Sequence, residues 1–95
     1  MDNFIVGAKE AGHTVELVDL YAERFDPCLY IPDEPDYENP EKIYSKAILT
    51  EMKRVERNDA LVMFFPVWWW SVPAMLKGWI DRVFNHGWAF GWEDE

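Results

Sequence analysis

Residues 60–73 read ALVMFFPVWWWSVP, an apolar run followed by a proline, three adjacent tryptophans and a second proline. Six consecutive apolar residues bounded by a proline are typical of a parallel strand that is covered on both faces. Three consecutive side chains cannot share one face of a strand or of a helix, because neighbouring side chains point in different directions in both. The three tryptophans, Trp68 to Trp70, therefore predict a loop or a surface that meets a partner or ligand.

The residues before this run predict a helix, a strand and a long loop. Apolar residues recur at helical spacing over 2–11, and Gly12 follows as a residue that commonly ends helices. Residues 14–20, TVELVDL, are β-branched and partly alternating, which predicts a strand. The stretch 21–38 is rich in proline and acidic residues and predicts a loop.

Two further helices are predicted on either side of the 60–65 strand. Asn39 and Pro40 are typical of a helix start, and one apolar stripe follows, formed by Ile43, Ala47, Ile48, Met52 and Val55. We expect this helix to end near Asn58 and Asp59. Pro73 opens the last helix, which Gly87 can end; its apolar face holds Leu76, Trp79, Ile80, Val83 and Phe84.

Helices that alternate with strands indicate an α/β layer with a parallel sheet. In such sheets ligands bind at the carboxyl ends of the strands. The tryptophan triplet comes immediately after the carboxyl end of the predicted 60–65 strand. Its position therefore favours contact with a ligand, although packing in the core is the alternative for Trp69 and Trp70.

Composition narrows the classes of function. The chain has 95 residues, enough for one domain, and a formal net charge of −9, which argues against nucleic-acid binding and against an anionic membrane surface. Cys28 is the single cysteine, which excludes an internal disulfide and suits a cytoplasmic protein. No apolar stretch reaches the length of a membrane span, and no spacing indicates a metal site.

Two segments resemble a known family. FPVWWWSVPAMLKGWIDRVFNHGWAFG, residues 65–91, and KEAGHTVELVDLYAERFDP, residues 9–27, are similar to the flavin-dependent NAD(P)H:quinone oxidoreductases of flavodoxin-like fold. The soluble ancillary subunits of glutathione-gated potassium efflux systems are similar over the first of these segments. The resemblance implies that residues 1–95 form a single partial flavodoxin-like domain with three layers. It would contain the second and third parallel strands of the family and its first to third helices.

The resemblance also implies a function and its residues. A flavin, FMN or FAD, would take hydride from NAD(P)H and pass it to a quinone-like acceptor. The loop that contacts the edge of the flavin ring corresponds to Pro66, Val67, Trp68, Trp69, Trp70 and Ser71, and the substrate pocket corresponds to Phe90 and Trp92. The alternatives are a non-catalytic regulatory subunit of a cation efflux system and an inactive truncated remnant.

The family has a first strand and a phosphate-binding loop that no segment here resembles, and its fourth and fifth strands are also absent. In the family that first strand lies between the strands that correspond to 14–20 and 60–65, so these two would face an empty slot. The two strands could pair directly, a second copy could fill the slot in a swapped dimer, or the chain could be part of a longer protein. We expect a truncated family member held as a homodimer or swapped oligomer.

The remaining polar residues have simpler interpretations. His86 is placed in the last turn of the third helix, where the helix dipole favours a cation and where a catalytic role is the less favoured alternative. Lys77, Asp81 and Arg82 are predicted to form surface ion pairs along that helix. The acidic run 33–41 is predicted to be a solvated loop.

Overall fold

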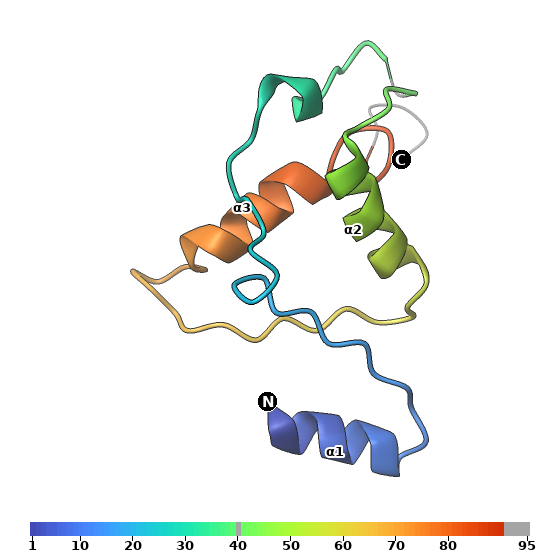
Figure 1. Cartoon of the computed structure of the whole chain (residues 1–95), viewed down its shortest axis with the longest axis vertical. Coiled ribbons are helices and arrows are strands. Elements are labelled where there is room, and N and C mark those ends of the chain that lie inside the picture. Colours follow the sequence, from blue (N-terminus) through green and yellow to red (C-terminus); the bar gives the residue numbers. More distant parts are fainter. Residues whose placement is uncertain (40, 91–95) are drawn as a thin grey trace.

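The computed structural model describes residues 1–39 and 41–90. Their regular elements are the α-helices α1 (Asp2–Glu10), α2 (Lys46–Glu56) and α3 (Ala74–Val83) and the short 3₁₀ helix η1 (Ile31–Asp33). Figure 1 shows α2 and α3 packed together and α1 set apart from them, with two extended segments running between. None of the helices in this described part combines the length and apolarity that crossing a membrane requires.

The predicted first helix is confirmed, and Gly12 ends it in the expected way. Gly12 has a φ of +91°, which is the left-handed conformation that glycine adopts without steric cost. Its N–H donates to the carbonyl of Lys9, and the N–H of His13 donates to the carbonyl of Ala8, each at 3.0 Å. These two bonds form a Schellman motif, which satisfies carbonyls that the end of a helix leaves without partners.

The predicted start of the second helix at Asn39 is wrong, because α2 begins at Lys46. Ser45 precedes it in an extended conformation, since its N–H and its hydroxyl both donate to the carboxylate of Asp33 at 2.7 Å. A tertiary contact therefore sets the start of this helix. As a consequence Ile43 lies outside the helix and is 81% exposed, while Tyr44 is buried in its place.

A small core lies between α2 and α3. Five apolar side chains are buried in it: Tyr44, Ile48, Met52, Trp79 and Val83. The indole nitrogen of Trp79 donates to Oε1 of Glu51 at 3.0 Å, so its polar atom is satisfied inside the core. No residue of α1 is buried, and α1 contacts the rest through the edge-to-face pair of Phe4 and Phe64, whose ring centroids are 5.4 Å apart.

A buried ion pair joins the long loop to α3. Nη2 of Arg82 lies 3.0 Å from Oδ2 of Asp33, and only 1% of Asp33 is exposed. The same guanidinium donates to the carbonyl of Asp26 at 2.6 Å and lies over the ring of Tyr30. The prediction that Arg82 takes part in a surface ion pair is therefore wrong, whereas the predicted pair of Lys77 and Asp81 forms at 2.7 Å.

The two predicted strands are extended in the structure but are not paired. No β-ladder occurs in residues 1–39 and 41–90, and the backbone groups of 14–18 and 60–67 make no hydrogen bond there. The 60–65 run is also more exposed than expected for a strand covered on both faces, with Leu61, Val62 and Phe64 about half exposed. A strand requires a partner for its backbone, and neither segment has one in this part of the chain.

We expect Gly78→Ala to destabilise the protein. A methyl group at Gly78 would lie 2.7 Å from Cα of Pro27 and closer still to its carbonyl, so the loop would have to move away from α3. The free energy of unfolding should fall by about 1–3 kcal/mol, as in other overpacked sites. Gly7→Ala is the matched control, because Gly7 is also helical and has open space around it; this change should raise stability by about 0.5–1 kcal/mol. Denaturant unfolding measures the stability of both variants. If the two substitutions changed the free energy of unfolding in the same direction, the close approach of Pro27 to Gly78 would be contradicted.

We expect Asp33→Asn to destabilise the protein at neutral pH and to weaken its acid sensitivity. Burial alone would raise the pKa of Asp33, but the hydrogen bonds from Ser45 and Arg82 outweigh it and hold the pKa below the ordinary value of 3.8. A carboxyl whose pKa is lower in the folded state contributes stability above its ordinary pKa, and this stability is lost as the pH falls through the folded pKa. The variant leaves Arg82 buried without a counter-charge, so its free energy of unfolding at pH 7 should fall by about 3–5 kcal/mol.

The measurement is urea unfolding of both proteins from pH 7 down to pH 2. The unchanged chain should lose more stability than the variant in the acidic range. Glu38→Gln, at an exposed site in the same loop, is the control and should follow the unchanged chain. Parallel curves for the unchanged chain and Asp33→Asn would show that this carboxyl does not carry the acid sensitivity.

Candidate functional site

The tryptophan triplet forms a tight turn between the extended segment 60–67 and α3. The N–H of Trp68 donates to the carbonyl of Ser71 at 3.1 Å, and the N–H of Ser71 donates back to Trp68 at 3.0 Å. The two central residues have positive φ angles, 49° at Trp69 and 63° at Trp70. Two positive φ values between a reciprocally bonded pair are the pattern of a type I′ turn.

The backbone of this turn is unfavourable for its residues. A type I′ turn favours Asn-Gly, because at positive φ the Cβ atom approaches the following carbonyl oxygen, at a cost of about 1–2 kcal/mol per residue. Glycine has no Cβ, and asparagine offsets the cost through local hydrogen bonds of its side chain. Burial does not offset this cost, since Trp69 is 94% exposed and Trp70 is 95% exposed. Strained residues of this kind cluster at ligand-binding sites. Within one copy of the chain, core packing of Trp69 and Trp70 is excluded.

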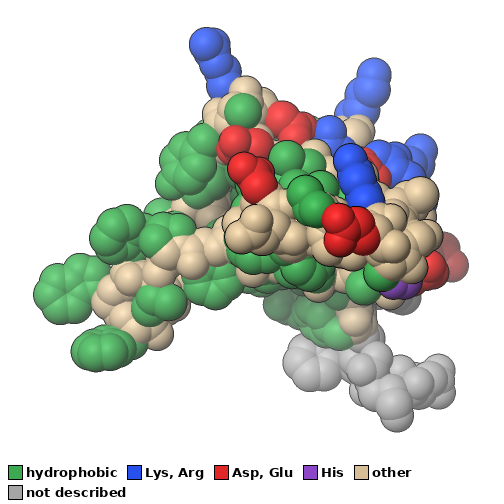
Figure 2. Space-filling model, turned by 90° about the horizontal axis from the view of Figure 1, so that it is seen from below, with side chains coloured by type: hydrophobic (Ala, Val, Ile, Leu, Met, Phe, Trp, Pro, Cys, Tyr) green, Lys and Arg blue, Asp and Glu red, His purple; other side chains and the backbone are tan. Residues whose placement is uncertain are grey.

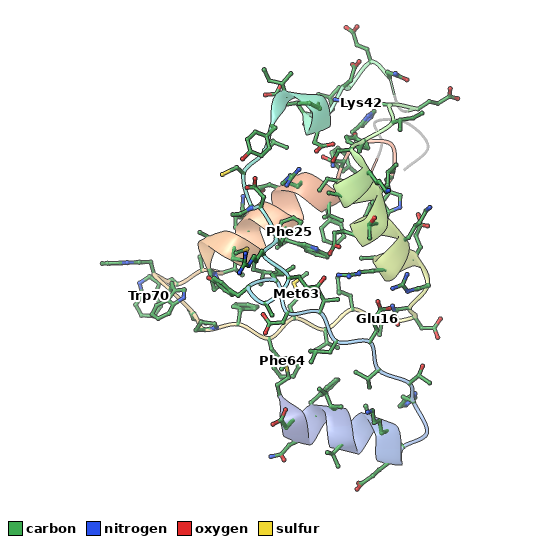
Figure 3. All side chains as sticks on the ribbon, in the orientation of Figure 1. Glu16, Phe25, Lys42, Met63, Phe64 and Trp70 are labelled. Atoms are coloured by element: carbon green, nitrogen blue, oxygen red, sulfur yellow. The ribbon has the colours of Figure 1, made fainter. Side chains whose placement is uncertain are left out.

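The turn presents both aromatic faces and free hydrogen-bond donors. The backbone N–H groups of Val67, Trp69 and Trp70 have no hydrogen-bond partner in the described part of the chain. Figure 2 shows hydrophobic side chains projecting from the end of the molecule at which Figure 3 labels Trp70. Large exposed apolar patches on soluble proteins mark binding sites for ligands or partners.

A groove of about 860 Å³ opens beside this turn. Its sides are the extended segments 14–20 and 60–65, and it ends near Pro66 and Pro73, which flank the turn. One wall comes from α1 and the other from α2 and α3, so most of its lining is apolar. The groove lies at the position of the slot that the sequence analysis expects between the two predicted strands.

The structure places Phe90 away from the turn. The turn precedes α3 and Phe90 follows it, and ten helical residues span about 15 Å. Phe90 instead lies against His86 and Tyr37, with ring centroids 5.6 and 6.4 Å away. Trp92, the other residue expected in a substrate pocket, lies outside the described residues. Within one copy of the chain, Phe90 and the turn do not form a common pocket.

His86 is buried beyond the end of α3 rather than in its last turn. Only 3% of it is exposed, its ring packs edge-to-face on Tyr37, and its carbonyl accepts the hydroxyl of Tyr44 at 2.9 Å. This environment is that of a packing residue at the end of the helix. The predicted placement of His86 in the last turn is wrong, because α3 ends at Val83.

Sequence reasoning missed the buried pair of Asp33 and Arg82, which holds the loop before α2. One signal was available in the sequence. Arg82 lies three residues after Trp79, on the same side of the helix, so the apolar face of α3 contains a charge that needs a buried partner. Nothing comparable marks Asp33, which belongs to a loop with many other acidic residues.

Comparison with known proteins identifies the family. The uncharacterized NAD(P)H oxidoreductase YcaK of Escherichia coli K12 is 45% identical over 84 residues, which cover 88% of this chain and 43% of that protein. NAD(P)H dehydrogenase (quinone) 1 of Cavia porcellus is 38% identical over 94 residues, which cover 83% of this chain and 34% of that protein.

A third relative, the glutathione-regulated potassium-efflux system ancillary protein KefF of Enterobacter sp. 638, is 50% identical over 44 residues. That match covers 46% of this chain and 25% of the relative. The chain thus spans less than half the length of these curated relatives. A family model described as flavodoxin-like fold matches residues 1–95, and the chain therefore belongs to the flavodoxin-like fold family.

Proposed function

We propose that the chain is part of an NAD(P)H oxidoreductase in which the tryptophan turn binds the ring of a flavin. The observation that carries this proposal is the pair of fully exposed indoles, Trp69 and Trp70, on an unfavourable backbone. The names of the relatives supply the reaction class, since they include an NAD(P)H oxidoreductase and a quinone dehydrogenase. The acceptor is accordingly a quinone or a similar small molecule.

The residues of the turn fit the ring of a flavin, whether FMN or FAD. Such a ring is flat, with apolar faces and a polar edge. Exposed indoles offer stacked or edge-on contact to the faces, and the free N–H groups of Val67, Trp69 and Trp70 suit carbonyl and nitrogen acceptors on the edge. The phosphate of a flavin nucleotide should contribute little to binding, because the chain carries a net charge of −9 and repels an anion.

When bound, flavin supplies the hydride-transfer chemistry, and the protein supplies binding and orientation. In this chain the bonded pair of Trp68 and Ser71 fixes the turn, whose two central indoles are exposed, and Figure 3 shows Trp70 projecting from one end of the molecule. Phe90 and Trp92 remain assigned to the substrate pocket, and a second subunit would have to bring Phe90 near the turn. The proposal also includes a cytoplasmic location and a homodimer or swapped oligomer. In it, residues 1–95 form a single partial flavodoxin-like domain.

A non-catalytic regulatory subunit is the second candidate. The observation that favours it is the similarity to the potassium-efflux ancillary protein, which is high over 44 residues. The exposed aromatic turn would then dock on a protein partner. Oxidation of NAD(P)H in the presence of added flavin and a quinone separates the two candidates, because only the first requires turnover.

The test of the site is a binding titration of the 95-residue chain with riboflavin, FMN and FAD. Riboflavin has the ring without a phosphate, so ring recognition by the turn predicts saturable binding of all three. We expect riboflavin to bind within about tenfold of FMN, because the phosphate contributes little here. Absence of saturable binding for all three would overturn the proposed flavin site.

We expect the double variant Trp69→Asn and Trp70→Gly to bind flavin weakly and to be more stable than the unchanged chain. Asn-Gly is the preferred pair for this turn, so relief of the strain should raise the free energy of unfolding by about 1 kcal/mol. Loss of the indoles should lower flavin affinity at least tenfold, measured by flavin fluorescence. Trp88→Phe, beyond the other end of α3, is the control and should bind as before. Unchanged affinity in the double variant would exclude the turn as the flavin site.

A further inference from the structure

A second, smaller hollow lies between the start of the long loop and the side of α2. Its volume is about 380 Å³, and Leu20, Arg24 and Phe25 line it together with Ala47 and Thr50 of α2. None of the residues that line it belongs to the tryptophan turn, so the hollow is separate from the proposed flavin site.

Arg24 occupies a backbone position that glycine normally takes. The N–H of Phe25 donates to the carbonyl of Leu20 at 2.9 Å, and the N–H of Arg24 donates to that of Tyr21 at 3.1 Å. This is the bond pattern of a Schellman motif, in which the residue at the place of Arg24 is left-handed and is usually glycine. Arg24 has a φ of +55°, which is strained for a residue with a Cβ atom. Strained residues of this kind cluster at functional sites.

Two lysines of α2 add positive charge beside the hollow. Lys46 and Lys53 lie four residues before and three residues after Thr50, which are the spacings at which side chains on a helix are neighbours. Both lysines and Arg24 are exposed, and their side chains make no hydrogen bond or ion pair in the described part of the chain. These three side chains form a cationic rim in a chain that has 18 acidic residues and 9 Lys and Arg residues.

The carboxylates that line the hollow are already bound within the chain. Glu23 pairs with Nη2 of Arg54 at 2.8 Å, and Oε1 of Glu51 accepts the indole N–H of Trp79 at 3.0 Å. A carboxylate oxygen of Asp26 accepts a tyrosine hydroxyl at 2.7 Å. These acidic groups therefore leave the charges of the cationic rim available to a ligand.

The spacing of the rim favours a peptide over a small anion. Lys53 follows Lys46 by seven residues, so their Cα atoms are about 10 Å apart along the helix. Side chains on one face of an extended peptide repeat every 7 Å or so, and a short run of carboxylates can therefore reach both lysines. The hollow is lined in part by Leu20, Phe25 and Ala47, which suits one apolar side chain of the same peptide.

We propose that the hollow and its cationic rim bind an acidic segment of a partner protein. Acidic side chains of the segment pair with the rim, and an apolar side chain between them enters the hollow. A nucleic acid is disfavoured as the partner, because the chain has a net charge of −9 and would repel an extended phosphate backbone. Exposed charges steer association and select partners more than they add affinity, so the binding should be reversible and sensitive to salt.

The test is a titration of a short fluorescein-labelled glutamate peptide, which carries one central leucine, with the 95-residue chain. Fluorescence anisotropy should show saturable binding at low salt, and added sodium chloride should weaken it by screening the charges. The same peptide with glutamine in place of each glutamate is the control ligand and should not bind.

We expect the double variant Lys46→Glu and Lys53→Glu to bind the acidic peptide about tenfold more weakly, because like charges would then face one another. Lys9→Glu combined with Lys77→Glu is the matched control. It changes the net charge by the same amount at exposed sites that do not line the hollow. Since charges beyond a Debye length are screened, this control should keep its affinity within about twofold at physiological salt.

Arg24→Gly separates the strain of the backbone from the charge of the side chain. This variant should unfold at a higher urea concentration, because glycine relieves the strain, and it should bind the peptide about threefold more weakly, because one exposed ion pair is lost. Arg24→Lys keeps both the charge and the Cβ atom, and it should match the unchanged chain in stability and in affinity.

The proposal is overturned by the absence of saturable binding of the acidic peptide, or by equal losses of affinity in the two double variants. It is also overturned if a thymidine oligonucleotide binds more tightly than the peptide, since the patch would then recognise polyanions in general. No flavin, NAD(P)H or quinone is added, so the result is independent of the proposed function.

Discussion

The pair of Asp33 and Arg82 is the contact on which most of the described fold depends. Arg82 belongs to α3 and Asp33 to the loop, and the same carboxylate binds Ser45, the residue that precedes α2. One buried charge therefore fixes the loop on α3 and sets the start of the neighbouring helix. Buried ion pairs often contribute little net stability compared with apolar residues, but they hold a chosen geometry, because a change in register would leave a charge without its partner.

The helices α2 and α3 share a buried apolar core, whereas the extended segments leave backbone groups without hydrogen-bond partners in the described part of the chain. Between α2 and α3 the apolar side chains are buried and the polar atom of Trp79 is bonded. Across the groove the side chains reach both layers, yet the backbone groups of 14–18 and 60–67 have no partners in the described part. The ion pairs of Glu16 with Arg54 and Arg57 hold the first segment against the end of α2, and they lower the pKa of Glu16 to about 2, mainly through the hydrogen bond from Arg57.

The proposed flavin site and the open groove both involve the segment 60–67. Residues 60–67 form one side of the groove and then enter the tryptophan turn, so whatever orders this segment also positions Trp69 and Trp70. A paired segment would limit the movement of the turn, since the turn is fixed at its other end by α3. The indoles would then meet a flat ligand at the carboxyl end of a completed strand, which is the usual binding position in α/β proteins.

The sequence alone determined that three helices form and that the tryptophans lie in a loop between an apolar segment and the last helix, because these features depend on local periodicity, on Gly12 and on Pro73. The membership of the family also followed from the sequence, through the long motif 65–91. Only the tertiary structure decided that α2 begins at Lys46, that Arg82 is buried and that the segments 14–20 and 60–65 are not paired. The physical reason is that a buried charge and a β-ladder each require a partner from elsewhere in the sequence, which local patterns do not specify.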